Sequence, residues 1–150
     1  MNLISKPAQR QSLAGVRLRK HADYERAYAA SRKRQSASMS WFLAARTLGG
    51  AEAGARIGLT VGKALGKAHE RNRIKRRARE ALRRHLGLLP QGFDLILHPR
   101  RGVLTLEFAR LEAEIVRILE EASAEAQRSE ALRGAAPVPL ARPAGVTRAS

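Results

Sequence analysis

The sequence contains no cysteine and few aromatic residues, and both shortages narrow what the protein does. Of its 150 residues, 4% are aromatic and none is cysteine. The lack of cysteine excludes disulfide bonds, thiolate metal sites and cysteine nucleophiles, and it is compatible with a reducing compartment. A chain of this length with so few aromatic residues is expected to form one domain with a compact core and tails.

Two further absences concern membranes and secretion. No apolar run approaches the roughly 20 residues that a membrane-spanning helix requires. The opening residues, MNLISKPAQRQ, lack the apolar region of a secretory signal peptide. We therefore expect a cytoplasmic protein with no membrane partner.

Residue patterns typical of catalysis are also absent. The histidines His21, His69, His85 and His98 are not spaced as metal ligands, and His98 is interpreted as the end of a strand. No group of three or four carboxylates suited to a two-metal nuclease occurs. The glycines and lysines of Lys63–Lys67 lack the full spacing of a phosphate-binding loop. We therefore predict no catalytic residue and no metal site in the protein itself.

Acidic residues are the minority of the charged side chains, and the excess of basic ones is concentrated in one segment. The chain has 29 Lys and Arg residues against 13 Asp and Glu residues, a net charge of +16. Residues 63–84 hold ten Lys and Arg against Glu70 and Glu80, which leaves +8, half of the total. Such a concentrated positive region is the electrostatic pattern of a nucleic-acid-binding protein.

The basic segment is typical of a packed amphipathic helix over Glu70–Leu86. Apolar residues recur there at steps of three to five and fall on one face, namely Ile74, Ala78, Ala81, Leu82 and Leu86. A run of mixed charges usually forms a solvated face with ion pairs between turns. Here the acidic partners are too few, and cations one turn apart repel one another. Phosphates of an RNA are the expected partners, because guanidinium groups bind their oxygens bidentately.

Shorter patterns predict the other elements. Tyr24 and Tyr28 share one face of a helix over His21–Ala30, and Thr105 is a candidate N-cap for a second long helix. Alternating or apolar runs predict strands over Met39–Arg46, Arg56–Val61 and Phe93–His98, and Ser31–Ser38 is expected to be a turn. The second long helix carries the apolar stripe Phe108, Leu111, Ile115, Ile118 and Leu119. A strand, the basic helix and a strand in succession predict a βαβ unit.

Both ends of the chain lack such periodicity. Residues 1–15 are expected to form a flexible basic segment, and residues 16–123 the folded domain. Residues 124–150 are rich in Ala, Pro and Arg, and we expect them to form a disordered tail.

Arg56–Val61 (RIGLTV), then Gly62-Lys63, then residues 68–76 (AHERNRIKR) resemble the signature of the bacterial ribonuclease P protein subunits. The resemblance runs from about Arg17 to Glu121 and includes the opening pattern R-L-R-K-x-x-D-aromatic-x-x-x-aromatic. It implies an α/β sandwich with a four-stranded, mostly antiparallel mixed sheet, three helices and a left-handed βαβ crossover. The handedness rests on the resemblance alone, because the general rule favours right-handed crossovers.

The resemblance also implies a function. The family's protein binds ribonuclease P RNA and precursor tRNA and assists removal of the 5′ leader, as part of an endoribonuclease holoenzyme. The RNA is the catalyst and holds most of the Mg²⁺, and no obligate protein partner is expected. The positions that match the family's catalytic-RNA-binding surface are Lys63, Lys67, Arg71, Asn72, Arg73, Lys75, Arg76 and Arg79. The positions that match its leader-binding aromatic residues are Tyr24, Tyr28 and Phe42.

Alternatives remain open at this stage. By spacing alone, Tyr24 and Tyr28 favour ordinary core packing. The basic helix also fits a general RNA-binding or ribosome-associated structural protein, although that leaves the aromatic pair and the Arg-Asn-Arg string as coincidence. The chain also departs from the family at Ala64, where a second lysine is common, and at both tyrosines, where Phe is usual.

Overall fold

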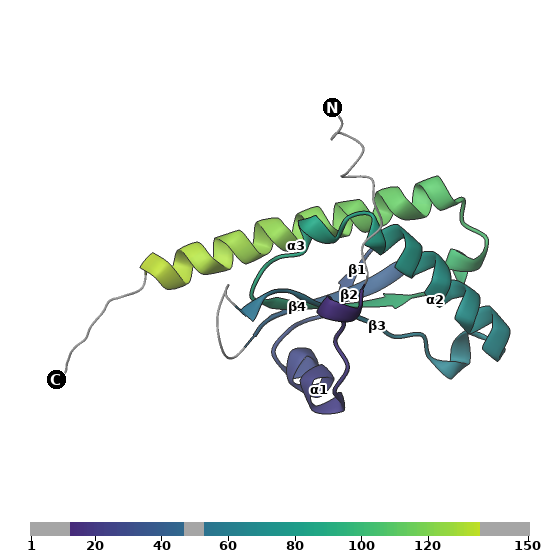
Figure 1. The fold of residues 1–150 in the computed structure, drawn as a ribbon, viewed down its shortest axis with the longest axis horizontal. Helices are drawn as coiled ribbons and strands as arrows, with labels where there is room; N and C mark the ends of the chain where they lie inside the picture. The colour runs from purple at the N-terminus through teal and green to yellow at the C-terminus, as the bar shows by residue number, and fades with distance from the viewer. Residues whose placement is uncertain (1–12, 47–52, 136–150) are drawn as a thin grey trace.

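The computed structural model describes residues 13–46 and 53–135, which form a four-stranded sheet with helices on both faces (Figure 1). The helices are α1 (His21–Ala29), α2 (Ala68–Arg83) and α3 (Phe108–Ala135). The strands are β1 (Arg34–Gln35), β2 (Met39–Ala45), β3 (Arg56–Leu59) and β4 (Phe93–Pro99). The short 3₁₀ helices are η2 (Ala14–Val16), η4 (Lys63–Leu65), η5 (Leu86–Leu88) and η6 (Arg101–Leu104). Most of the expected flexible first segment and the end of the expected tail lie outside the described residues.

The sheet has the strand order β1-β2-β4-β3. The β1–β2 and β2–β4 pairs are antiparallel, whereas β3 and β4 are parallel neighbours joined through α2. This arrangement confirms the predicted mixed sheet, and the handedness of the crossover stays a prediction. The expected turn over Ser31–Ser38 is wrong in one respect, because it contains β1. This strand lies at the edge of the sheet and spans two residues, so it leaves no alternating pattern in the sequence.

The two faces of the sheet are covered by different helices. Helices α2 and α3 lie against one face and α1 against the other (Figure 1). Trp41 and Leu43 of β2 belong to the larger core under α2 and α3. The smaller cluster under α1 contains Leu18, Ala27, Ala44 and Ile96, with Tyr24, Tyr28 and Phe42 packed against it. The domain therefore has one deep core and one shallower cluster that is partly open to solvent.

Helix α2 buries a narrow apolar face. Ile74, Ala78, Ala81 and Leu82 are buried against the rest of the domain, as the sequence pattern predicts. The predicted end at Leu86 is wrong, because the helix stops at Arg83 and Leu86 begins the separate 3₁₀ helix η5. At the other end, a Glu70 carboxylate oxygen accepts a hydrogen bond from the Lys67 backbone N–H at 3.0 Å. This capping contact fixes where the helix begins.

Glu70 makes a contribution to stability that depends on pH. The Arg101 guanidinium, which donates to Glu70 at 2.9 and 3.1 Å, and the Lys67 N–H lower the pKa of this carboxyl from 4.5 to about 2. A carboxyl group whose pKa is lower in the folded state than in the unfolded state stabilises the fold at pH values above its unfolded pKa. That stabilisation is lost as the pH falls through the folded pKa. Glu70→Gln is therefore expected to lower the melting temperature at pH 7. The difference from the wild type should shrink between pH 4.5 and about 2, and a difference independent of pH would contradict this role.

Helix α3 differs from the expectation at both ends. It begins at Phe108, and Thr105 instead follows η6 as its C-terminal cap residue. It runs to Ala135, so the expected disordered tail is wrong for residues 124–135. Ala126 is 5% exposed and belongs to the larger core, and Glu125 forms an ion pair with Arg34. The stretch is rich in Ala, Glu, Gln and Arg, which favour helix strongly, so sparse burial suffices to keep it helical.

Candidate nucleic-acid interface

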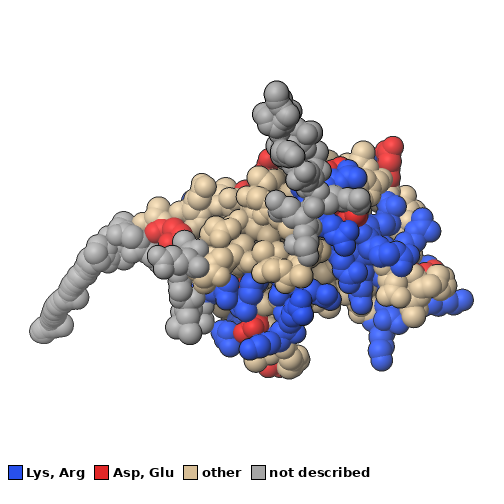
Figure 2. All heavy atoms as spheres, in the orientation of Figure 1, with Lys and Arg blue, Asp and Glu red and all other residues tan. Residues whose placement is uncertain are grey.

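The outward face of α2 is a continuous cationic surface. Asn72, Arg73 and Arg76 are exposed, as are Lys63 and Lys67 just before the helix. Figure 2 shows Lys and Arg gathered over α2, with few acidic side chains among them. The buried residues of α2 occupy one side of the helix, so the residues on its other sides point to solvent. This surface favours a polyanionic ligand.

Several cations of the same segment are occupied within the protein. Arg71 Nε donates to the Gly66 carbonyl at 3.1 Å, and Arg77 donates to the Leu106 carbonyl. Arg84 lies 3.6 Å from a Glu112 carboxylate oxygen. By contrast, in the described ranges no acidic side chain forms an ion pair with the following cations: Lys63, Lys67, Arg73, Lys75, Arg76 and Arg79. Six of the eight predicted RNA-binding residues are therefore free to neutralise an external anion, Asn72 is exposed without a charge, and Arg71 is partly structural.

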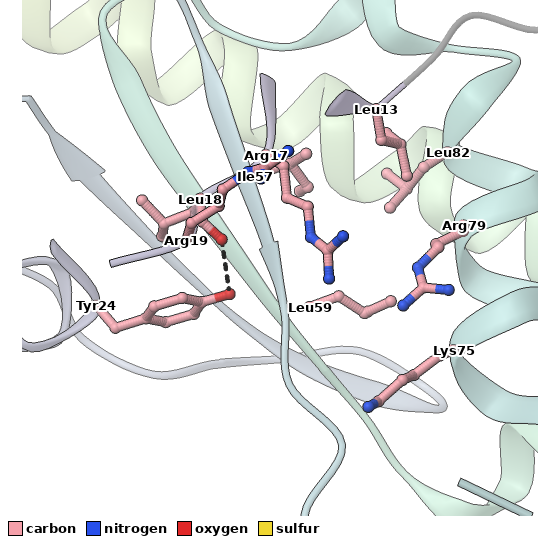
Figure 3. Close-up of a pocket in the computed structure, with 10 residues that line it drawn as sticks. All are labelled: Leu13, Arg17, Leu18, Arg19, Tyr24, Ile57, Leu59, Lys75, Arg79 and Leu82. Atoms are coloured by element: carbon pink, nitrogen blue, oxygen red, sulfur yellow. Dashed lines mark hydrogen bonds between the residues drawn. The ribbon is translucent and has the colours of Figure 1, made fainter. Parts of the chain in front are cut away.

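A groove of about 360 Å³ lies between α2, β3 and the segment that leads into α1 (Figure 3). Its cationic lining comes from Lys75 and Arg79 of α2 and from Arg17 and Arg19, far away in the sequence. Its apolar lining includes Ile57, Leu59 and Leu82. Burial and the neighbouring cations Arg17, Arg83 and Arg76 lower the pKa of the Arg79 guanidinium from its ordinary value. Cations held this close without acidic partners favour a bound anion, because it relieves their repulsion.

Arg17 and Arg19 reach the groove through strand-like pairing. The Leu18 backbone N–H donates to the Ile57 carbonyl at 2.8 Å, and Arg17 forms a bridge to Ile57. Side chains alternate along an extended segment, so Leu18 enters the cluster under α1 while Arg17 and Arg19 remain exposed. Sequence reasoning omitted both arginines from the site. The opening Arg-Leu-Arg-Lys pattern was the sequence feature that could have indicated them.

The predicted aromatic residues lie together on the α1 face of the sheet. The ring centroids of Tyr24 and Tyr28 are 6.3 Å apart, and those of Tyr28 and Phe42 are 5.0 Å apart in an edge-to-face arrangement. All three are partly exposed. His98 of β4 completes the group, with its ring 5.6 Å from Tyr28 and 5.1 Å from Phe42. These four rings, here called the aromatic cluster, are packed on the sheet and also reachable from solvent.

Tyr24 connects the aromatic cluster to the cationic groove. Its ring lines the groove beside Arg17 and Arg19, and its hydroxyl donates to the Leu18 carbonyl at 3.3 Å (Figure 3). The ring passes so close to β3 that a Cβ at Gly58 would lie 2.7 Å from the hydroxyl oxygen. Only glycine permits this approach. One surface therefore runs from the cations of α2, through the groove, to the aromatic cluster.

An ion-pair network holds α1 against the sheet. Arg56 Nε and Nη2 donate to the buried Asp94 carboxylate at 2.8 and 2.9 Å. Arg56 Nη1 also donates to Asp23 in the first turn of α1, at 3.0 Å. Burial opposes ionisation of Asp23, but Arg56 and Arg26 outweigh it and lower the pKa of this carboxyl. Helix α1 carries two rings of the aromatic cluster, so this network positions them.

We expect Asp94→Asn to lower the free energy of unfolding by about 2 kcal/mol, because Arg56 loses the charge of its buried partner. Arg56 keeps Asp23 and some solvent contact, which limits the loss. The loss is measured by denaturant unfolding. Glu120→Gln is the matched control, because it removes one carboxylate charge from an exposed position on α3. Equal stability of the two variants would show that the network adds nothing to the fold.

The described residues lack the features of two other kinds of site. Residues 13–46 and 53–135 contain no group of three His, Asp or Glu side chains placed to hold a metal ion. Among the same residues, no helix is both long enough and apolar enough to cross a membrane.

Comparisons with known proteins agree with this geometry. A model of the family described as Ribonuclease P matches residues 14–123. The ribonuclease P protein component of Thermotoga maritima is 45% identical over 47 residues, which cover 31% of this chain and 39% of that protein. The component of Chloroflexus aggregans is 43% identical over 54 residues, 35% of this chain and 40% of that protein. The aligned segments thus span about two fifths of these curated relatives.

Solved structures align over a larger share. The structure of the Thermotoga maritima RNase P protein matches with a TM-score of 0.60 and 26% identity, over 70% of this chain and 96% of that one. The Staphylococcus aureus RNase P protein is 24% identical and has the same fold, with a TM-score of 0.60 over 71% of this chain and 94% of that one.

Proposed function

The chain belongs to the family of bacterial ribonuclease P protein subunits, and from this we propose that it binds ribonuclease P RNA and, in that complex, precursor tRNA. The holoenzyme is the endoribonuclease that removes the 5′ leader and leaves the mature 5′ end. In this proposal the RNA is the catalyst and would hold the Mg²⁺, which would supply metal-ion catalysis of the hydrolysis. The exposed cations of the described residues support the RNA-binding part of this proposal, because their charge suits phosphate groups.

The outward face of α2 is the proposed contact with ribonuclease P RNA. Arg73, Arg76 and Arg79 of this helix form no ion pair with an acidic side chain in the described part of the chain, and guanidinium groups pair with phosphate oxygens at two points each. Each neutralised phosphate also releases counterions, which makes the binding depend on salt. The observation that carries the proposal is that these cations have no acidic partner among the described residues, on a helix that bears the family's Arg71-Asn72-Arg73 string.

The groove and the aromatic cluster are the proposed path of the leader. Arg17 and Arg19 would neutralise leader phosphates, and the rings that follow would stack on its bases. Every base has a π face, so stacking accepts leaders of varied sequence at about 1 to 3 kcal/mol per base. The continuity of groove and cluster through Tyr24 favours a single strand that crosses both.

Reconstitution tests the proposal directly. The purified protein and a bacterial ribonuclease P RNA, mixed at low Mg²⁺, should cleave precursor tRNA at the mature 5′ end. The protein without the RNA should not cleave. If the protein failed to stimulate the RNA and bound it no better than an unrelated structured RNA of equal length, the proposal would be wrong.

A further inference from the structure

His98 belongs to the aromatic cluster, and its ring carries two nitrogen atoms that packing of the rings does not require. It lies on β4 opposite Ser40 of β2, and its ring contacts both Tyr28 and Phe42. Its side chain is partly exposed, whereas Ile96, two residues earlier on the same face, is fully buried. The strand therefore places an imidazole at the open edge of the cluster.

One imidazole nitrogen of His98 already has a partner. Nε2 lies 2.7 Å from the Tyr28 hydroxyl oxygen. Burial and the nearby Lys33 lower the pKa of His98 from 6.5, so the ring is neutral at pH 7. A neutral imidazole has one N–H and one acceptor nitrogen. The phenol is the stronger acid and the imidazole nitrogen the stronger base, so Tyr28 donates and Nε2 accepts.

This hydrogen bond fixes the tautomer and leaves the proton on Nδ1. In the described part of the chain, Nδ1 makes no hydrogen bond, and it is not among the buried polar atoms that lack a partner. It is therefore a donor with some access to solvent, beside rings that are partly exposed. Phe at position 28 would have no hydroxyl to hold this tautomer.

We infer that His98 binds the leader: its Nδ1–H donates a hydrogen bond to an acceptor on a leader nucleotide that stacks beside Tyr28 and Phe42. The inference rests on the proposed leader-binding function and adds a directional polar contact to it. Stacking alone does not orient a base, whereas a hydrogen-bond donor of fixed position does. His98 and Tyr28 thus act as a pair that sets the leader preference of this chain.

The test uses the reconstituted holoenzyme and the ratio of its affinities for precursor and mature tRNA. His98→Phe keeps a ring but has no N–H, and should lower this ratio about threefold to tenfold, as expected for one hydrogen bond. His98→Asn has an amide donor and should recover part of the loss. Affinity for mature tRNA, which has no leader, should not change. Melting temperatures of both variants provide the control for folding.

A series of leaders, each with one abasic nucleotide, locates the acceptor. If His98 contacts a base, the effects of His98→Phe and of one abasic position should not add. If they add at every position while the ratio still falls, the acceptor lies on the sugar or phosphate. An unchanged ratio for both His98 variants would overturn the inference. Should Tyr24→Ala with Tyr28→Ala still lower the ratio in that case, only the role of His98 fails, and if it does not, the leader path fails with it.

Discussion

Replacing Arg73, Arg76 and Arg79 together by alanine should weaken binding of ribonuclease P RNA by about a hundredfold. Each guanidinium is expected to neutralise one phosphate, so the slope of log affinity against log salt should fall in magnitude by about 2 to 3. The three side chains lie off the buried stripe of α2, so the fold should persist. Arg71 is left out because its hydrogen bond to the Gly66 carbonyl would mix a structural effect with the loss of binding.

The matched control removes the same charge from another place. Arg110, Arg117 and Arg128 are exposed on α3, and their replacement by alanine changes the net charge by the same amount. We expect this variant to bind the RNA nearly as well as the wild type. Equal losses in the two triple variants would mean that total charge, and not the surface of α2, determines binding.

Replacing Tyr24 and Tyr28 together by alanine should weaken binding of precursor tRNA by roughly tenfold to a hundredfold for each stacked base that is lost. Mature tRNA should bind as before, because it has no leader. Both rings are partly buried, so some stability should also be lost. Affinities are therefore measured at a temperature where circular dichroism shows both proteins to be folded.

The competing interpretation is that these rings only pack in the core and do not contact RNA. It expects a loss of stability and an equal loss of affinity for both RNAs, so that the ratio stays constant. The variants Tyr24→Phe and Tyr28→Phe separate the contributions further, because each keeps its ring. Tyr24→Phe loses the bond to the Leu18 carbonyl, whereas Tyr28→Phe loses the bond to His98. We expect the second change to affect precursor binding more.

Local patterns predicted much of the fold. The apolar stripe of α2 and the runs that form β2, β3 and β4 appear in the sequence because each is set by residues close together in the chain. The family resemblance supplied the aromatic positions, which the structure brings together. Whether these residues bind RNA stays a prediction.

The contacts that the sequence did not predict join distant segments. Arg17 reaches the groove because its neighbour Leu18 pairs with Ile57 of β3. Asp94 pairs with Arg56 across two parallel strands, and His98 of β4 contacts Tyr28 of α1. No periodicity records such contacts, since they depend on strand register and on how α1 packs on the sheet. The continuation of α3 was missed for another reason, because its weak apolar pattern is compensated by residues of high helix propensity.

The most direct measurement of the central claim compares precursor and mature tRNA binding with and without the protein. Dissociation constants for both tRNAs are determined for the RNA subunit alone and for the reconstituted complex, at identical Mg²⁺ and salt concentrations. If the groove and the aromatic cluster hold the leader, the protein should raise the preference for precursor over mature tRNA at least tenfold, about 1.4 kcal/mol. The same preference with and without the protein would contradict the account, and would leave a basic protein that binds RNA without reading the leader.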